Sequence, residues 1–168
     1  FFLVCYGQLS AVALGCVTAA FCALQRGRRG LAGLALGLLI YKPQLGIAMA
    51  IVFLSAREWR IIAGGVAGVA AQLGLAWAYA GTAAIQAYLD TLTHLNGVLP
   101  LVQQKRHLLQ SLRSFFDLIL PWPGAALAAY LLASAGVLFW TWRVWRSETP
   151  LSLRYSLLLI ATVLVSPH

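Results

Sequence analysis

The stretch LAGLALGLLIYKPQLG, residues 31–46, decides how this sequence is interpreted, together with the apolar run that follows it as far as Ser55. A helix that crosses the hydrocarbon core of a bilayer needs about 20 apolar residues. The segments Leu31–Tyr41 and Leu45–Ser55 supply about 11 each, and Lys42-Pro43-Gln44 lies between them. Because unpaired polar groups are costly in a membrane, we expect a short helical hairpin whose polar tip serves a site.

The composition around this hairpin is typical of a polytopic helical membrane protein. Of the 168 residues, 61% are hydrophobic and 10% are charged, and the mean hydropathy is +0.84. A formal net charge of +8 could indicate nucleic acid binding, but the basic residues lie in short clusters between apolar spans. We therefore predict an all-α integral membrane protein that contacts membrane lipids and no nucleic acid. Phe1 opens within apolar sequence without an initiator Met, so we expect a fragment.

Hydropathy predicts a single transmembrane domain over residues 1–168. Its spans are expected at about 9–24, 31–41 with 45–55 as the hairpin, 61–80, 124–142 and 153–165. The outer loop is expected at 81–123. Within it, apolar residues at helical spacing between Gln103 and Leu120 predict an amphipathic helix on the membrane surface.

Other patterns predict packing rather than chemistry. Two glycine pairs have the G-x-x-x-G spacing that lets helices approach closely, Gly33 with Gly37 and Gly64 with Gly68. The three cysteines show no metal-binding spacing, so we expect neither a metal nor a cofactor.

Three basic clusters set the expected orientation of the spans. They are Arg26, Arg28 and Arg29; Arg57 and Arg60; and Arg143, Arg146 and Arg154. Because short cytoplasmic loops retain positive charge, all three should be cytoplasmic, and the segment between the first two must then leave the cytoplasm and return. The hairpin satisfies this requirement. Its tip, Gln8, the loop 81–123 and His168 would lie on the outer side, where an enzyme needs a lipid-carried donor or an extracytoplasmic substrate.

Five pieces of the sequence, taken in order, resemble glycosyltransferase family 87. They are GQLS at 7–10, QRGRRG at 25–30, LAGLALGLLIYKPQLG at 31–46, REWR at 57–60 and LVSPH at 164–168. The resemblance implies a polyprenyl-phosphate-mannose-dependent mannosyltransferase with the multi-span C-type glycosyltransferase fold. It also implies a site facing outward from the bacterial plasma (inner) membrane and a glycan or glycolipid acceptor of the cell envelope. The general-base carboxylate is expected in an outer loop upstream of Phe1.

Five residues are the candidates for the site, each with a structural alternative. Lys42 could neutralise the donor phosphate, or extend to the interface as lysines near helix ends do. Gln44 could hydrogen-bond sugar or phosphate, or cap the second arm; Gln8 could line the site, or cap a span. His168 could support catalysis, though not as the base, or be a hydrogen-bonded structural residue. Arg113, beside the apolar face of the outer helix, could bind the donor, or belong to a solvated basic face.

Two other classes of function remain open on the sequence alone. A broken helical hairpin with a polar tip is also how transporters build sites near the membrane midplane, so a transporter or flippase of lipid-linked or anionic substrates is the alternative. A non-catalytic scaffold of an envelope complex would leave Lys42 and His168 dispensable. An upstream outer loop with an Asp or Glu would favour the transferase, and a repeat of these spans would favour the transporter.

Overall fold

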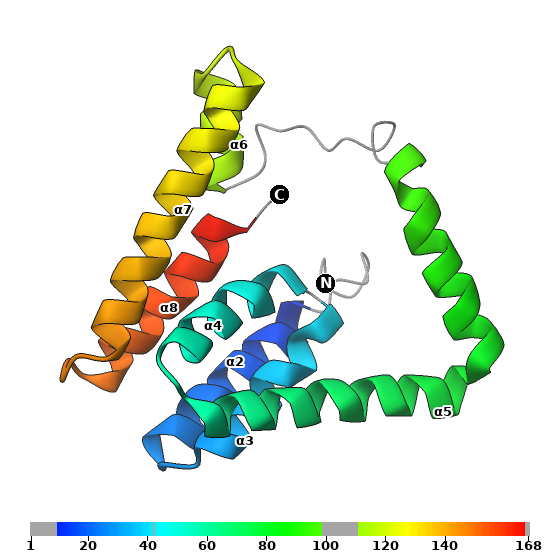
Figure 1. Cartoon of the computed structure of the whole chain (residues 1–168). Coiled ribbons are helices and arrows are strands. Elements are labelled where there is room, and N and C mark those ends of the chain that lie inside the picture. Colours follow the sequence, from blue (N-terminus) through cyan, green and yellow to red (C-terminus); the bar gives the residue numbers. More distant parts are fainter. Residues whose placement is uncertain (1–9, 42, 99–110, 167–168) are drawn as a thin grey trace.

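The computed structural model describes residues 10–41, 43–98 and 111–166, and every regular element in these ranges is a helix. The predicted all-α class is therefore confirmed for this part of the chain. The helices are α2 (Ser10–Gln25), α3 (Arg29–Gly37), the 3-10 helix η1 (Leu38–Tyr41), α4 (Pro43–Ser55), α5 (Trp59–Val98), α6 (Leu112–Ile119), α7 (Pro123–Trp145) and α8 (Leu151–Val165) (Figure 1).

Among the described residues, two stretches of helix are long and apolar enough to cross a membrane. They are Trp59–Ala87 of α5 and Pro123–Trp145 of α7. Large apolar side chains on both are open to the surroundings, for example Leu75, which is 72% exposed, and Leu132, which is 76% exposed. Such a surface is unfavourable in water and favourable in lipid. The number of membrane crossings stays a prediction.

Close packing of α3 on α5 confirms the expectation from the glycine spacings. A methyl group at Gly33 would overlap the carbonyl oxygen of Ile61, and one at Gly64 would overlap that of Gly30. Gly37 and Gly68 likewise face backbone atoms of the opposite helix. The two backbones thus approach to a distance that only glycine permits, which is the usual basis of helix association in membranes.

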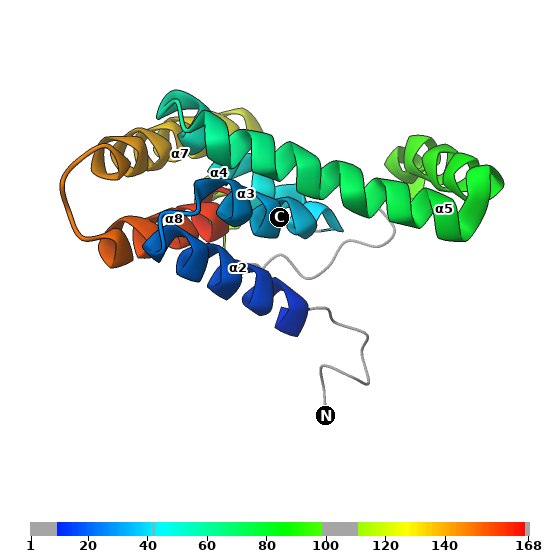
Figure 2. The same ribbon diagram turned by 90° about the horizontal axis from the view of Figure 1, so that it is seen from below.

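Three turns that carry the basic clusters lie at the same end of the helices, which we call the basic end. They are the α2–α3, α4–α5 and α7–α8 turns, on the left in both Figure 1 and Figure 2. Arg29 Nη1 donates to Glu58 Oε2 at 2.8 Å, joining the first turn to the second. Trp142 Nε1 donates to the Ser55 carbonyl at 3.0 Å, joining α7 to the end of α4. Which side of the membrane this end faces stays a prediction.

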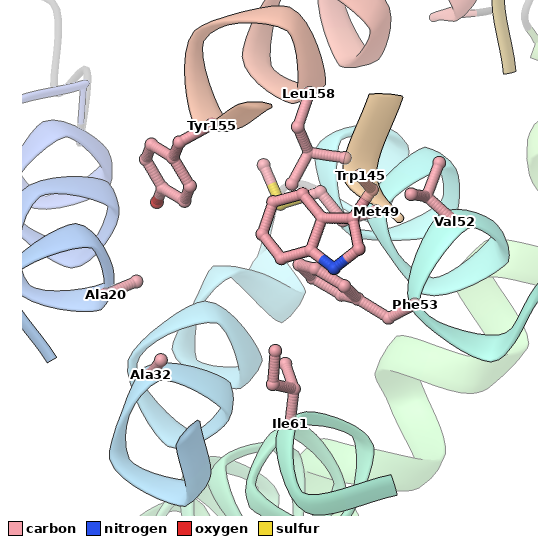
Figure 3. Close-up of a cluster of buried hydrophobic side chains, with 9 residues drawn as sticks. All are labelled: Ala20, Ala32, Met49, Val52, Phe53, Ile61, Trp145, Tyr155 and Leu158. Carbon is pink, nitrogen blue, oxygen red and sulfur yellow. The ribbon is translucent and has the colours of Figure 1, made fainter. Parts of the chain in front are cut away.

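The hydrophobic core lies close to the basic end and draws side chains from six helices (Figure 3). The ring of Trp145 packs edge-on against Phe53, with centroids 5.0 Å apart. Tyr155 packs against Phe21 and donates its hydroxyl to the Val17 carbonyl at 2.7 Å, which fixes α8 to α2. Because the buried contacts gather here, this end is the rigid base of the molecule.

The segment expected as an outer loop over 81–123 is more helical than the hydropathy pattern indicated. α5 continues through it to Val98 and bends at Gly81, whose φ of 76° and ψ of 170° are outside the helical region. The described part of the expected amphipathic helix is α6, which starts after Ser111; the Ser111 side chain accepts a hydrogen bond from Ser114 N. Hydropathy marks where apolar sequence ends, whereas a polar helix can continue beyond that point.

Candidate functional site

The two arms of the expected hairpin are α3 with η1 and α4. Ala32 near the start of α3 and Phe53 near the end of α4 both lie in the core at the basic end, so the chain reverses direction between Tyr41 and Pro43. The arms have largely different neighbours. α3 with its glycines packs closely on α5 and α2, whereas α4 packs on α7 and α8 and less extensively on α5. The arms are therefore free to stand apart along part of their length.

An apolar groove of about 360 Å³ lies between these arms and α5. Its lining extends from Phe53 and Ile61 in the core to Ile40 of η1 and Ile47 of α4, next to the tip. Every residue that lines it is apolar or glycine. A groove of this size is within the range of about 300–1,000 Å³ typical of ligand sites, and its surface suits a hydrocarbon chain rather than a sugar.

The first turn of α4 forms one side of the tip. The helix begins at Pro43, a residue well suited to the first position because its missing N–H would have no intrahelical partner. Its dipole therefore presents partial positive charge to the tip, where the sequence also places Lys42. Only the backbone of Gln44 is described, and it lies in this same turn.

Three of the predicted site residues, Gln8, Lys42 and His168, lie outside the described residues. The elements next to them in sequence are the start of α2, the η1–α4 junction and the end of α8. These lie at the end of the helices opposite the basic turns, which we call the tip end (Figure 1). The described neighbours of the three residues thus lie at the same end of the helices, and the roles of the three residues themselves stay predictions.

Arg113 lies on α6, with an exposed side chain that makes no ion pair with another described residue. α6 packs on α7 and touches α8. Tyr130 of α7 donates its hydroxyl to the Val165 carbonyl at 2.8 Å, which holds α7 against the last turn of α8. This places Arg113 on the same side of the helices as the end of α8, while its proposed contact with a donor stays a prediction.

Sequence reasoning did not predict the groove. The glycine spacings indicated that α3 packs closely on another helix, but not that α4 stands away from both. A weak signal was Gly46, a further small residue in the first turn of α4, whose position lines the groove and where an added Cβ would meet nothing within 4 Å.

Comparison with known proteins identifies one family. The family model of glycosyltransferase family 87 matches residues 1–167. No curated protein and no solved structure matches the chain. The resemblance seen in the five sequence pieces is therefore confirmed over nearly the whole chain.

Proposed function

The chain belongs to glycosyltransferase family 87. We propose that it transfers a hexose, which we expect to be mannose, from a polyprenyl-phosphate donor to an extracytoplasmic glycan or glycolipid. Glycosyltransferase activity follows from the family, whose members are membrane enzymes. The lipid nature of the donor is our inference, and one observation carries it. The apolar groove reaches Ile40 and Gly46, on either side of the K-P-Q segment, so an apolar surface lies close to the start of α4 and to the part of the sequence that contains Lys42.

These two surfaces match the two parts of a polyprenyl-phosphate sugar. The isoprenoid chain would lie in the groove between the arms and α5, where it makes van der Waals contacts with apolar side chains. The phosphate would then lie at the tip, close to the Lys42 ammonium and the positive end of the α4 dipole. A nucleotide sugar has no comparable apolar part, which is why the groove favours a lipid donor.

The transfer step follows from this placement. The oxygen of an acceptor hydroxyl attacks the anomeric carbon while the bond from that carbon to the donor phosphate breaks. Negative charge builds on the leaving phosphate, and an ammonium already at that position stabilises it without reorganisation. Gln8, Gln44 and Arg113 are proposed to bind the donor, and His168 to support the step. The proton of the hydroxyl passes to a carboxylate base, which we do not assign to a residue of this chain.

Transfer of labelled mannose from polyprenyl-phosphate-mannose, by membranes that contain the full-length protein, tests the proposal. Lys42→Ala should lower the rate about 100-fold, in the range of other lost transition-state charge contacts, while Lys42→Arg should retain much of it. Undiminished transfer by Lys42→Ala would reject the phosphate role. No transfer from any polyprenyl-linked sugar would favour the transporter or flippase, whose tip could be equally charged.

A further inference from the structure

The basic end carries an unusual concentration of exposed positive charge. Its three turns and the residues beside them hold eight arginines, Arg26, Arg28, Arg29, Arg57, Arg60, Arg143, Arg146 and Arg154, and two acidic residues, Glu58 and Glu148. All eight except Arg154 are exposed, and among the described residues only Arg29 is in an ion pair. A surface of this kind attracts anions, and the attraction is stronger than for scattered charges because the turns are joined.

The type of cation at the basic end is informative. All eight are arginine, whereas both lysines of the chain, Lys42 and Lys105, occur elsewhere in the sequence. A guanidinium presents a planar fork of donors that fits two oxygens of a phosphate, which an ammonium cannot do. The exposed guanidinium of Arg146 lies 5.8 Å from the centroid of Trp142. That of Arg154 lies 6.0 Å from the centroid of Trp145 and is partly used within the protein, because its Nη1 donates to the Trp145 carbonyl at 3.2 Å.

Backbone geometry at Arg57 is a second and independent observation. The α2–α3 turn closes with Gly27 N bonded to Leu24 O and Arg28 N bonded to Ala23 O, and Gly27 has a φ of 70°. The α4–α5 turn repeats this pattern of bonds with Arg57 in the position of the glycine. Arg57 has a φ of 60° and is the only non-glycine residue with positive φ among those described. A left-handed backbone conformation is unfavourable for a residue with a side chain. The α4–α5 turn therefore has a charged residue at a position where glycine would be less strained.

The arginines lie at a boundary between polar and apolar surface. Trp59, next to Arg60, is 62% exposed, and Trp140 on the last turns of α7 is 61% exposed. Exposed indole rings beside charged groups are typical of the region where lipid headgroups meet the hydrocarbon core. The guanidinium groups would therefore be level with lipid phosphates.

From these observations we propose that the basic end binds the phosphate headgroups of anionic phospholipids in the leaflet next to it. The arginine forks contact the phosphate oxygens while Trp59 and Trp140 contact the acyl chains. The site is separate from the tip end, because the 15 residues of α8, which run from the α7–α8 turn to the tip end, span about 22 Å. The proposal stands whether or not the sugar donor is a polyprenyl phosphate.

The test measures lipid preference of the full-length protein in phosphatidylcholine nanodiscs, with spin-labelled phosphatidylglycerol or phosphatidylcholine as the probe. The unmodified protein should restrict phosphatidylglycerol more than phosphatidylcholine. Arg57→Gly should lower this preference about fivefold, as expected for one arginine near an anionic surface. Because glycine relieves the left-handed strain, the variant should unfold at the same or a higher temperature, so that lost binding is not lost folding.

A control and a salt titration complete the test. Lys105→Gln removes one charge that lies outside the three basic turns in the sequence, and should leave the preference unchanged. Raising ionic strength from about 0.1 M to 1 M shortens the Debye length from about 10 Å to 3 Å and should weaken the preference of the unmodified protein. The proposal is overturned if the unmodified protein shows no preference, if Arg57→Gly retains it, or if Lys105→Gln lowers it equally.

Discussion

Gly46 is the residue at which the groove can be tested with least disturbance to the fold. It lies in the first turn of α4, lines the groove, and has no atom within 4 Å of the position that a Cβ would occupy. Gly46→Leu should therefore fold normally and fill the groove. We expect about tenfold lower kcat/KM with a long-chain polyprenyl-phosphate sugar, since a change of one methylene in a hydrophobic pocket alters kcat/KM by about 10–200-fold.

The control for Gly46→Leu is Gly15→Leu on α2, where an added Cβ also meets nothing within 4 Å and which does not line the groove between the arms and α5. A donor with a short isoprenoid chain provides the second comparison, because it need not occupy the groove and should be used by both variants. Equal loss with long and short donors would mean that Gly46→Leu disturbs the tip rather than the groove.

The sequence predicted some features of the site and not others. The motif pieces pointed correctly to the family, because each joins unusual residues in a fixed order, as in Lys42-Pro43-Gln44. They could not reveal the groove, whose existence depends on how far α4 stands from α5. α4 also packs on α7 and α8, as in the contact of Phe53 with Trp145, and these partners are about 90 residues away in sequence.

At the scale of elements, the contact of α3 with α5 predicts a strong difference between two glycines of α5. Gly64→Ala places a methyl group against the Gly30 carbonyl, whereas Gly74→Ala meets nothing within 4 Å. Gly64→Ala should destabilise the protein by about 1–3 kcal/mol, the usual cost of overpacking. Gly74→Ala should be neutral or stabilise it by up to about 1 kcal/mol, because alanine is the better helix former. Thermal unfolding in detergent measures both, and equal stability of the two variants would contradict the packing described.

The bend in α5 is expected to depend on a single residue, Gly81. Gly81 combines φ 76° with ψ 170°, a region almost restricted to glycine, and no neighbouring atom lies within 4 Å of an added Cβ. Gly81→Ala should therefore straighten the helix for conformational rather than packing reasons. Spin labels at Val66 and Gln86 would be about 30 Å apart along a straight helix and closer in the bent one.

Distances between these labels from electron spin resonance test the bend directly. Gly81→Ala should lengthen the separation, whereas Gly74→Ala, on the same helix before the bend, should leave it unchanged. An unaltered distance with unaltered stability would show that the bend does not depend on glycine.

Element prediction from the sequence succeeded where apolar residues were continuous and was incomplete where they were not. Apart from α5, the helices at the expected spans begin and end within a few residues of the apolar segments, because hydrophobic runs and glycine or arginine turns mark their limits. The part of α5 after Gly81 was expected as loop, since hydropathy falls there while alanines at 83 and 84 still favour helix. Hydropathy and helix propensity are different properties, and hydropathy alone does not predict a helix of mixed polarity.

At the scale of the whole molecule, the structure separates two ends that the sequence had assigned to opposite sides of the membrane. The basic turns are joined by Arg29 to Glu58 and by Trp142 to Ser55, so they must all face the same side. The η1–α4 junction and the end of α8 lie at the other end (Figure 1). The 23 residues of α7 cover about 34 Å, which slightly exceeds a hydrocarbon core of about 30 Å.

Labelling of single cysteines in intact cells tests this arrangement. With Cys5, Cys16 and Cys22 replaced by alanine, a membrane-impermeant maleimide should label cysteine introduced at Lys42 or His168 from outside. Cysteine at Arg28 or Arg60 should react only after the membrane is made permeable, because positively charged turns are retained in the cytoplasm. The pairs act as controls for each other, since a leaky membrane labels all four and poor expression labels none. If cysteines at positions 42 and 28 react from the same side, the helices do not cross the bilayer as proposed. The proposals of an outward-facing site and of a lipid-linked donor bound there would then both be wrong.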